Sequence, residues 1–188
     1  MVPLMSLWLP VLVSAVGVFV ASSITHMVLP LHRNDMRKLP ADKEDEILDA
    51  LRRIGVPSGD YAVPNAGSPA GMSDPGFIAK ATKGPLVLMT IAPGSPPSIG
   101  PYLGRWFVYC VVVGIFVAYV AGVVFAPGAD STTVLRVVST VTFLAYGMAL
   151  PQFSIWYRRS WATTMKALLD SLIYGLVTGA VFAWLWPK

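Results

Sequence analysis

The chain has 188 residues, of which 55% are hydrophobic and only 13% are charged, and its mean hydropathy is +0.62. Soluble domains carry about 25% charged residues, so this composition excludes an ordinary soluble enzyme, and a disordered or nucleic-acid-binding chain even more strongly. The net charge of +4 is too small to indicate a nucleic-acid partner. The composition therefore indicates a membrane protein.

Four apolar stretches are long enough to cross a bilayer as helices. About 20 mostly apolar residues are needed to span about 30 Å of hydrocarbon. The stretches run over about Leu4–Leu29, Tyr102–Ala126, Thr133–Tyr157 and Thr163–Trp186. Because backbone groups in lipid must be paired within the segment, we predict an all-α integral membrane protein with four transmembrane helices. Pro151 is expected to kink the third helix near its end.

The basic residues predict the orientation of these helices. No Lys or Arg precedes Arg33, so the first stretch is expected to be a retained span rather than a signal peptide. Twelve basic residues fall on one side of the predicted membrane and two, Arg136 and Lys188, on the other. By the positive-inside rule, the long loop and the Arg158-Arg159 turn are cytoplasmic and both termini are periplasmic. The chain thus divides into helix 1 (1–30), a cytoplasmic loop region (31–101) and helices 2–4 (102–188).

The long loop carries one short amphipathic helix and one short β segment. The helix is predicted to open at Leu39-Pro40-Ala41-Asp42 and to run to Ile54, with acidic residues at its start and basic residues at its end. Its apolar stripe is a candidate docking surface made of Ile47, Leu48, Leu51 and Ile54. This stripe docks on its own protein, on the lipid surface, or on a partner. Pro57–Pro75 is expected to be an extended connection, and Leu86–Ile91 a strand that pairs within the loop or with another subunit.

One carboxylate lies inside a predicted span. Asp170 is about two turns into the fourth helix, where an ionised group is costly and normally faces the bundle interior. Lys166, four residues earlier, and Arg105, near the start of the second helix, are its candidate partners. These three residues form either an interhelical clamp, which the sequence favours, or part of an ion pathway.

The only two histidines, His26 and His32, lie at the end of the first helix with Asp35 close behind. As a site they would supply imidazole and carboxylate ligands to a metal, but Pro30 lies between the histidines, so regular helical geometry cannot be assumed to bring them together. The favoured interpretation is that His26 bonds to a helix end and that His32 is an interfacial cation. We therefore predict no metal site, with His26 and His32 as weak candidates, and the sequence indicates no particular cofactor.

Small residues form ridges on two of the predicted helices. Gly175 and Gly179 make a GxxxG step in the fourth helix, and Gly114, Ala118 and Gly122 make a similar ridge in the second. Such ridges allow helix backbones to approach closely. They predict close packing rather than a wide pore, either within the chain or with a second chain.

Two groups of short motifs lie near the start and the end of the chain. The first comprises His26, Leu29-Pro30, His32, Asp35, Leu39-Pro40, Gly59, Tyr61 and Pro64, and the second Lys166, Asp170, Ile173-Tyr174 and Trp184-Leu185-Trp186-Pro187. With these motifs the chain resembles a group of small bacterial inner-membrane proteins that have no assigned function. The resemblance implies a bacterial inner-membrane location and supplies no activity, cofactor or catalytic residue.

Three functional hypotheses follow. The favoured one is an inner-membrane accessory or scaffolding subunit that docks through its cytoplasmic loop and small-residue helix faces. Its partners would be the lipid bilayer and other membrane subunits or a second copy, and no nucleic acid. The alternative is a small transporter or ion-translocating protein that uses Asp170. An enzyme or redox protein using His26 and His32 is the third and least favoured, since no Ser-His-Asp, P-loop or GxGxxG pattern is present.

Overall fold

The computed structural model describes all 188 residues and divides them into two compact units. The first unit combines Met1–Arg37 with Ser98–Lys188, and the second is Lys38–Pro97. All four apolar stretches belong to the first unit, and most of the long loop forms the second.

Four helical segments of the first unit are long and apolar enough to cross a membrane. They cover Leu4–Val28, Gly100–Val124, Ser131–Tyr157 and Trp161–Leu185. These are the four predicted stretches, displaced by only a few residues at their ends. The predicted multi-pass, helical membrane fold is therefore confirmed at this level.

The first segment changes geometry just before the histidines. It consists of a 3-10 turn, helix α1 (Trp8–Ser23) and a π-helical turn, Ile24–Val28. The amide of Leu29 donates to the carbonyl of Ile24 at 2.9 Å, and Leu29 itself is extended. The residue before a proline is disfavoured in the helical region, so the helix ends here and the chain turns into a short 3-10 turn at Pro30–His32.

The third segment is interrupted rather than kinked. Helix α5 (Ser131–Gly147) ends three residues before α6 (Pro151–Tyr157) begins. Pro151 is the first residue of α6, a position where its missing N–H costs nothing. The remaining two helices, α4 (Gly100–Val124) and α7 (Trp161–Leu185), are continuous over 25 residues each.

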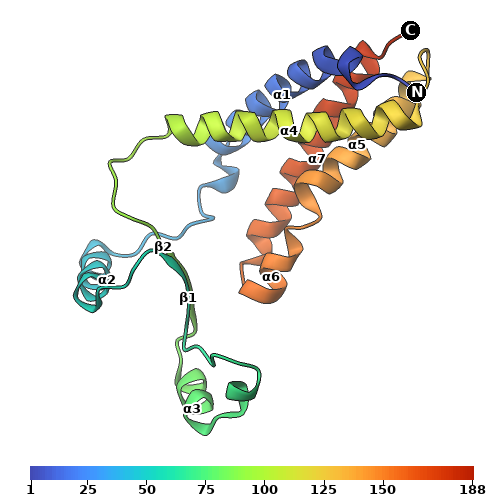
Figure 1. Ribbon diagram of the computed structural model, residues 1–188. Coiled ribbons are helices and arrows are strands. Elements are labelled where there is room, and N and C mark those ends of the chain that lie inside the picture. Colours follow the sequence, from blue (N-terminus) through green and yellow to red (C-terminus); the bar gives the residue numbers. More distant parts are fainter. The chain divides into compact units, whose positions relative to one another are not determined.

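Helix α7 is central to the packing of the first unit (Figure 1). It packs mainly against α5 and also against α1, while α4 lies against α1. Phe182, Val117, Val134 and Val138 form part of the buried core. Many other large apolar side chains of these helices are exposed, as Phe116 of α4 is. An apolar outer surface of this kind fits contact with lipid.

Both termini lie at the same end of the helical bundle (Figure 1). The amide of Val2 donates to the carbonyl of Gly122 at 2.8 Å, and the amide of Gly128 donates to the carbonyl of Pro187 at 2.8 Å. The α4–α5 turn therefore adjoins both chain ends. The end of α1 and the α6–α7 turn lie at the opposite end, and the assignment of either end to the cytoplasm remains a prediction.

The second unit contains a two-stranded sheet with helices before and between its strands. Strand β1 (Gly59–Val63) pairs antiparallel with β2 (Val87–Ile91), and Gly59 lies opposite Ile91. The predicted Leu86–Ile91 strand thus pairs within the loop. The strand β1 corrects the expectation of an extended connection from Pro57 to Pro75.

Two helices complete the second unit. Helix α2 (Ala41–Ile54) ends at Gly55, whose φ of 68° is the left-handed conformation that glycine adopts without strain. Helix α3 (Pro75–Lys83) was not anticipated from the sequence, and the side chain of Asp74 caps it by accepting from the amide of Phe77 at 2.8 Å.

Candidate metal centre

The turn after α1 brings the two histidines face to face. The imidazole rings of His26 and His32 stack with centroids 4.1 Å apart and planes 1° apart. The π-helical turn, the extended Leu29 and the 3-10 turn that follows lie between or around the two rings. The histidines thus meet although Pro30 lies between them, a contact that regular helical spacing does not predict.

Asp170 of α7 lies beside both histidines. Its Oδ2 is 2.9 Å from Nε2 of His32 and 3.8 Å from Nε2 of His26. The Asp170 side chain is only 5% exposed, whereas that of His26 is 48% exposed. The histidines, and not Lys166 or Arg105, are thus the charged or polar partners of this intramembrane carboxylate.

Lys166 and Arg105 have other contacts. The Nζ of Lys166 donates to Oδ1 of Asp35 at 2.8 Å, and Oδ2 of Asp35 lies 2.7 Å from Nδ1 of His32. Lys166 thus reaches the site through Asp35, while Arg105 is exposed near the ring of Tyr102. Burial raises the pKa of Asp35, but hydrogen bonds from Lys166 and His32 outweigh this effect and hold the pKa below its usual value.

The contacts of Nδ1 differ between the two histidines. Nδ1 of His26 lies 3.1 Å from the carbonyl oxygen of Ser22 and 3.0 Å from Oγ1 of Thr25, so it has a partner in either tautomer. Nδ1 of His32 donates to the carboxylate of Asp35, so the Nε2 of a neutral His32 directs a lone pair toward Asp170. Because the two rings are stacked and parallel, the in-plane lone pairs of both Nε2 atoms do not converge on one atom in this arrangement.

With a neutral His32, a lone pair of its Nε2 faces a carboxylate oxygen of Asp170 that is 2.9 Å away. Neither His32 Nε2 nor Oδ1 of Asp170 has a hydrogen-bond partner. With neutral histidines, the two carboxylates of Asp35 and Asp170 and the ammonium of Lys166 sum to one negative charge. Unbalanced buried charge is costly, so the site requires a proton or a metal ion.

The three side chains supply two nitrogen ligands and one oxygen ligand for a metal ion, and one histidine ring must turn out of the stack for both Nε2 atoms to face the same ion. The ligand atoms of His26, His32 and Asp170 all lie within 4.8 Å of one another. Ligands of a tetrahedral zinc ion are about 3.3 Å apart when each bond is about 2.0 Å. The His26 ring is half-exposed and is the one with room to turn. Metal-binding histidines commonly donate their other nitrogen to a carboxylate or a carbonyl, and here Nδ1 of His32 lies beside a carboxylate and Nδ1 of His26 beside a carbonyl.

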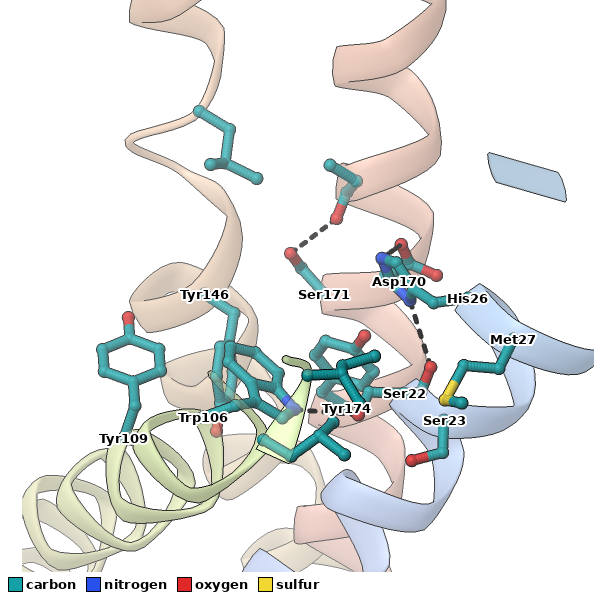
Figure 2. Close-up of a pocket in the computed structure, with 14 residues that line it drawn as sticks. Ser22, Ser23, His26, Met27, Trp106, Tyr109, Tyr146, Asp170, Ser171 and Tyr174 are labelled. Atoms are coloured by element: carbon teal, nitrogen blue, oxygen red, sulfur yellow. Dashed lines mark hydrogen bonds and ion pairs between the residues drawn. The ribbon is translucent and has the colours of Figure 1, made fainter. Parts of the chain in front are cut away.

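A cavity of about 450 Å³ adjoins this cluster. Figure 2 shows His26 and Asp170 on one side of it, Trp106, Tyr109 and Tyr146 on the other, and Tyr174 between them. The indole N–H of Trp106 donates to Oγ of Ser22 at 2.8 Å, which joins α4 to α1. The cavity therefore has one polar end and a wide aromatic and apolar wall.

The small-residue ridges pack inside the bundle. Gly175 and Gly179 face the backbone of α5, where a Cβ on Gly175 would lie 2.7 Å from the carbonyl oxygen of Ser139. Gly114 faces Val11 of α1, and Gly122 faces the backbone of Val2. These four glycines hold the bundle together, and their faces are already occupied within one chain. The docking stripe of α2, in contrast, has Ile47, Leu48 and Ile54 exposed and Leu51 partly exposed.

Two features of the site were not predicted from the sequence: the contacts of Asp35 with both His32 and Lys166, and the aromatic cavity. One signal for the link was present, since His26, His32 and Asp35 are close in sequence and Leu29-Pro30 between them predicts an extended residue that turns the chain. The cavity had no such signal because its walls come from four separate helical segments. Comparison with known protein families, curated proteins and solved structures finds no match to this chain.

Proposed function

We propose that this chain is a multi-pass membrane protein that binds a divalent transition-metal ion through His26, His32 and Asp170. The observation that carries the proposal is the meeting of two histidines and one buried carboxylate. Nε2 of His32 lies 2.9 Å and Nε2 of His26 lies 3.8 Å from Oδ2 of Asp170, and neither His32 Nε2 nor Asp170 Oδ1 has a hydrogen-bond partner.

The donor set narrows the class of metal. Imidazole suits zinc, copper, iron and nickel, while six oxygen ligands would favour magnesium or calcium. Two imidazoles and one carboxylate are also the ligands of several catalytic zinc and non-haem iron centres, which keep coordination positions open. His26 and Asp170 line the cavity, so we expect an open position on that side.

Metal binding is tested directly on protein purified in a mild detergent with a tag that contains no histidine. After treatment with a chelator, titration with Zn²⁺ and elemental analysis should give one tightly bound ion per chain. His32→Ala and His26→Ala each remove one of three ligands and should abolish tight binding. Asp45→Asn, on the exposed face of α2, is the matched control and should bind like the wild type. A wild-type protein that retains no ion, or a His32→Ala variant that still binds one, would contradict the proposal.

Asp35 is expected to act as a positioning residue for His32. Asp35→Asn removes the carboxylate that orients the His32 ring and leaves Lys166 without its partner. Loss of such an outer partner typically lowers metal affinity by about 10–100-fold. A competition titration against a chelating dye measures this change. Unchanged affinity would show that Asp35 does not orient the ligand.

An accessory-subunit role is a second candidate, favoured by the exposed apolar stripe of α2. The glycine faces of α4 and α7 already pack within the chain and do not support this role. The role therefore rests on the exposed stripe of α2 alone. In native mass spectrometry, the wild type should retain a stoichiometric membrane subunit that Leu48→Asp loses and Asp45→Asn keeps. A lone monomer would contradict this role.

Ion translocation through Asp170 is the remaining alternative. The buried hydroxyls of Thr142 and Ser171 donate to carbonyls of their own helices, a structural use that does not build a path. Flux through proteoliposomes that Asp170→Asn abolishes would favour translocation.

A further inference from the structure

The cavity beside the proposed metal centre has the properties of a ligand site. Its volume of about 450 Å³ is within the range of about 300–1,000 Å³ typical of small-molecule pockets. It is partly open, and it includes the exposed edge of His26. A molecule in the cavity can therefore reach an open coordination position of a metal bound there.

The net charge of the site with a divalent ion bound favours one kind of chemical group at the open coordination position. Without metal, Asp35, Asp170 and Lys166 sum to one negative charge, and a divalent ion changes the sum to one positive charge. Because an unbalanced charge in a buried site is costly, the loaded centre favours a singly charged anionic oxygen as a further ligand. Carboxylates and phosphates supply such an oxygen.

The serine hydroxyls around the polar end cannot hold an anion in place of the metal. Ser22 and Ser23 both donate to the carbonyl of Phe19, and Ser171 donates to the carbonyl of Ala167. Their protons are therefore already used, and these three serines supply no hydrogen bond to an anion at this end.

The rest of the cavity wall favours a ligand with an apolar part. Trp106, Tyr109 and Tyr146 face the cavity together with aliphatic side chains that include Leu103 and Leu150. Aromatic and aliphatic walls of this extent stabilise a ligand by burial of its hydrocarbon. The helices that carry these walls are all span-length and apolar, so molecules that reside in a bilayer have access to the same region.

We propose that the cavity binds an amphipathic molecule whose carboxylate or phosphate oxygen coordinates the metal and whose hydrocarbon part packs against Trp106, Tyr146 and Leu103. This inference rests on the proposed metal-binding function. It adds a ligand class, an oxyanion on an apolar chain, and requires that the binding of this ligand depend on the metal.

Cobalt loading separates the two proposals. Co²⁺ has visible absorption bands that respond to its ligands, so the protein is loaded with Co²⁺ in a non-ionic detergent and titrated with dodecyl phosphate. The bands should shift and saturate at a concentration at least about tenfold lower than inorganic phosphate requires, since each 1.4 kcal/mol of burial is tenfold in affinity. Dodecyltrimethylammonium, which has the same chain and the opposite charge, should cause no shift.

A pair of tryptophan substitutions locates the hydrocarbon part. Leu103→Trp fills the cavity without touching a metal ligand and should weaken the response to dodecyl phosphate at least about tenfold, with an unchanged Co²⁺ titration. Val108→Trp, at an exposed position of the same helix, should behave like the wild type. Equal responses of Leu103→Trp and Val108→Trp would overturn the proposed location.

Two further results tell a wrong ligand class apart from a failure of metal binding itself. If Co²⁺ binds and its spectrum ignores dodecyl phosphate, or responds equally to inorganic phosphate, the ligand class is wrong and the metal site stands. If Co²⁺ does not bind, the proposed function fails, and this inference fails with it.

Discussion

Replacing Asp170 with asparagine is expected to abolish the stabilisation that metal confers on the wild type. An ion that binds only the folded state at 100 times its Kd stabilises by about 2.7 kcal/mol. For a chain of this length that corresponds to a rise in Tm of about 5–10 °C. Asp170→Asn removes the only anionic ligand, so its Tm should not respond to Zn²⁺. Thermal unfolding in detergent with and without Zn²⁺ measures the difference.

The same variant separates a metal ligand from an interhelical clamp. Without metal and with a neutral His32, the amide of Asn at position 170 can donate to the Nε2 of His32 that lies 2.9 Å from the Asp170 carboxylate in the wild type. We therefore expect the metal-free variant to be at least as stable as the metal-free wild type. If the variant instead unfolds at a lower temperature and metal has no effect on either protein, Asp170 is a clamp to a charged histidine.

Adding one methyl group at Gly175 is expected to destabilise the helical bundle. The new Cβ would lie 2.7 Å from the carbonyl oxygen of Ser139, a backbone atom that cannot move without displacing α5. Overpacking of this kind typically costs about 1–3 kcal/mol. Unfolding of Gly175→Ala in mixed micelles with increasing SDS, followed by circular dichroism, should show this loss relative to the wild type.

Gly104 provides the matched control on α4. A Cβ at Gly104 would have nothing within 4 Å, and alanine in place of glycine inside a helix gains roughly 0.5–1 kcal/mol. Gly104→Ala should therefore be neutral or slightly stabilising. Equal effects of the two substitutions would mean that the approach of α5 and α7 does not depend on glycine.

The helical spans could be predicted from the sequence because membrane crossing is a local property. Twenty apolar residues in a row predict a helix in lipid without knowledge of any other part of the chain. Only the ends of the four spans differ from the prediction, by a few residues each. Proline marked the position of the break before Pro151, but the sequence predicted a kink and the structure has two separate helices, α5 and α6.

The site could be predicted only in part because its contacts are not local. Asp170 stood out as a costly carboxylate inside a span, and His26 and His32 stood out as the only histidines. Their meeting depends on the direction in which the chain turns after α1 and on the packing of α7 against α1. Helical spacing suggested Lys166 as the partner of Asp170, yet Lys166 pairs with Asp35 across 131 positions.

That long separation has a consequence for how the chain is made. The two histidines leave the ribosome early, in the first helical segment, whereas Asp170 and Lys166 arrive only with the last one. Until α7 has inserted, the histidines have no carboxylate from it, and no three-ligand set exists. On the proposed function, acquisition of the ion would follow the docking of the final helix, so metal loading would report a completed bundle.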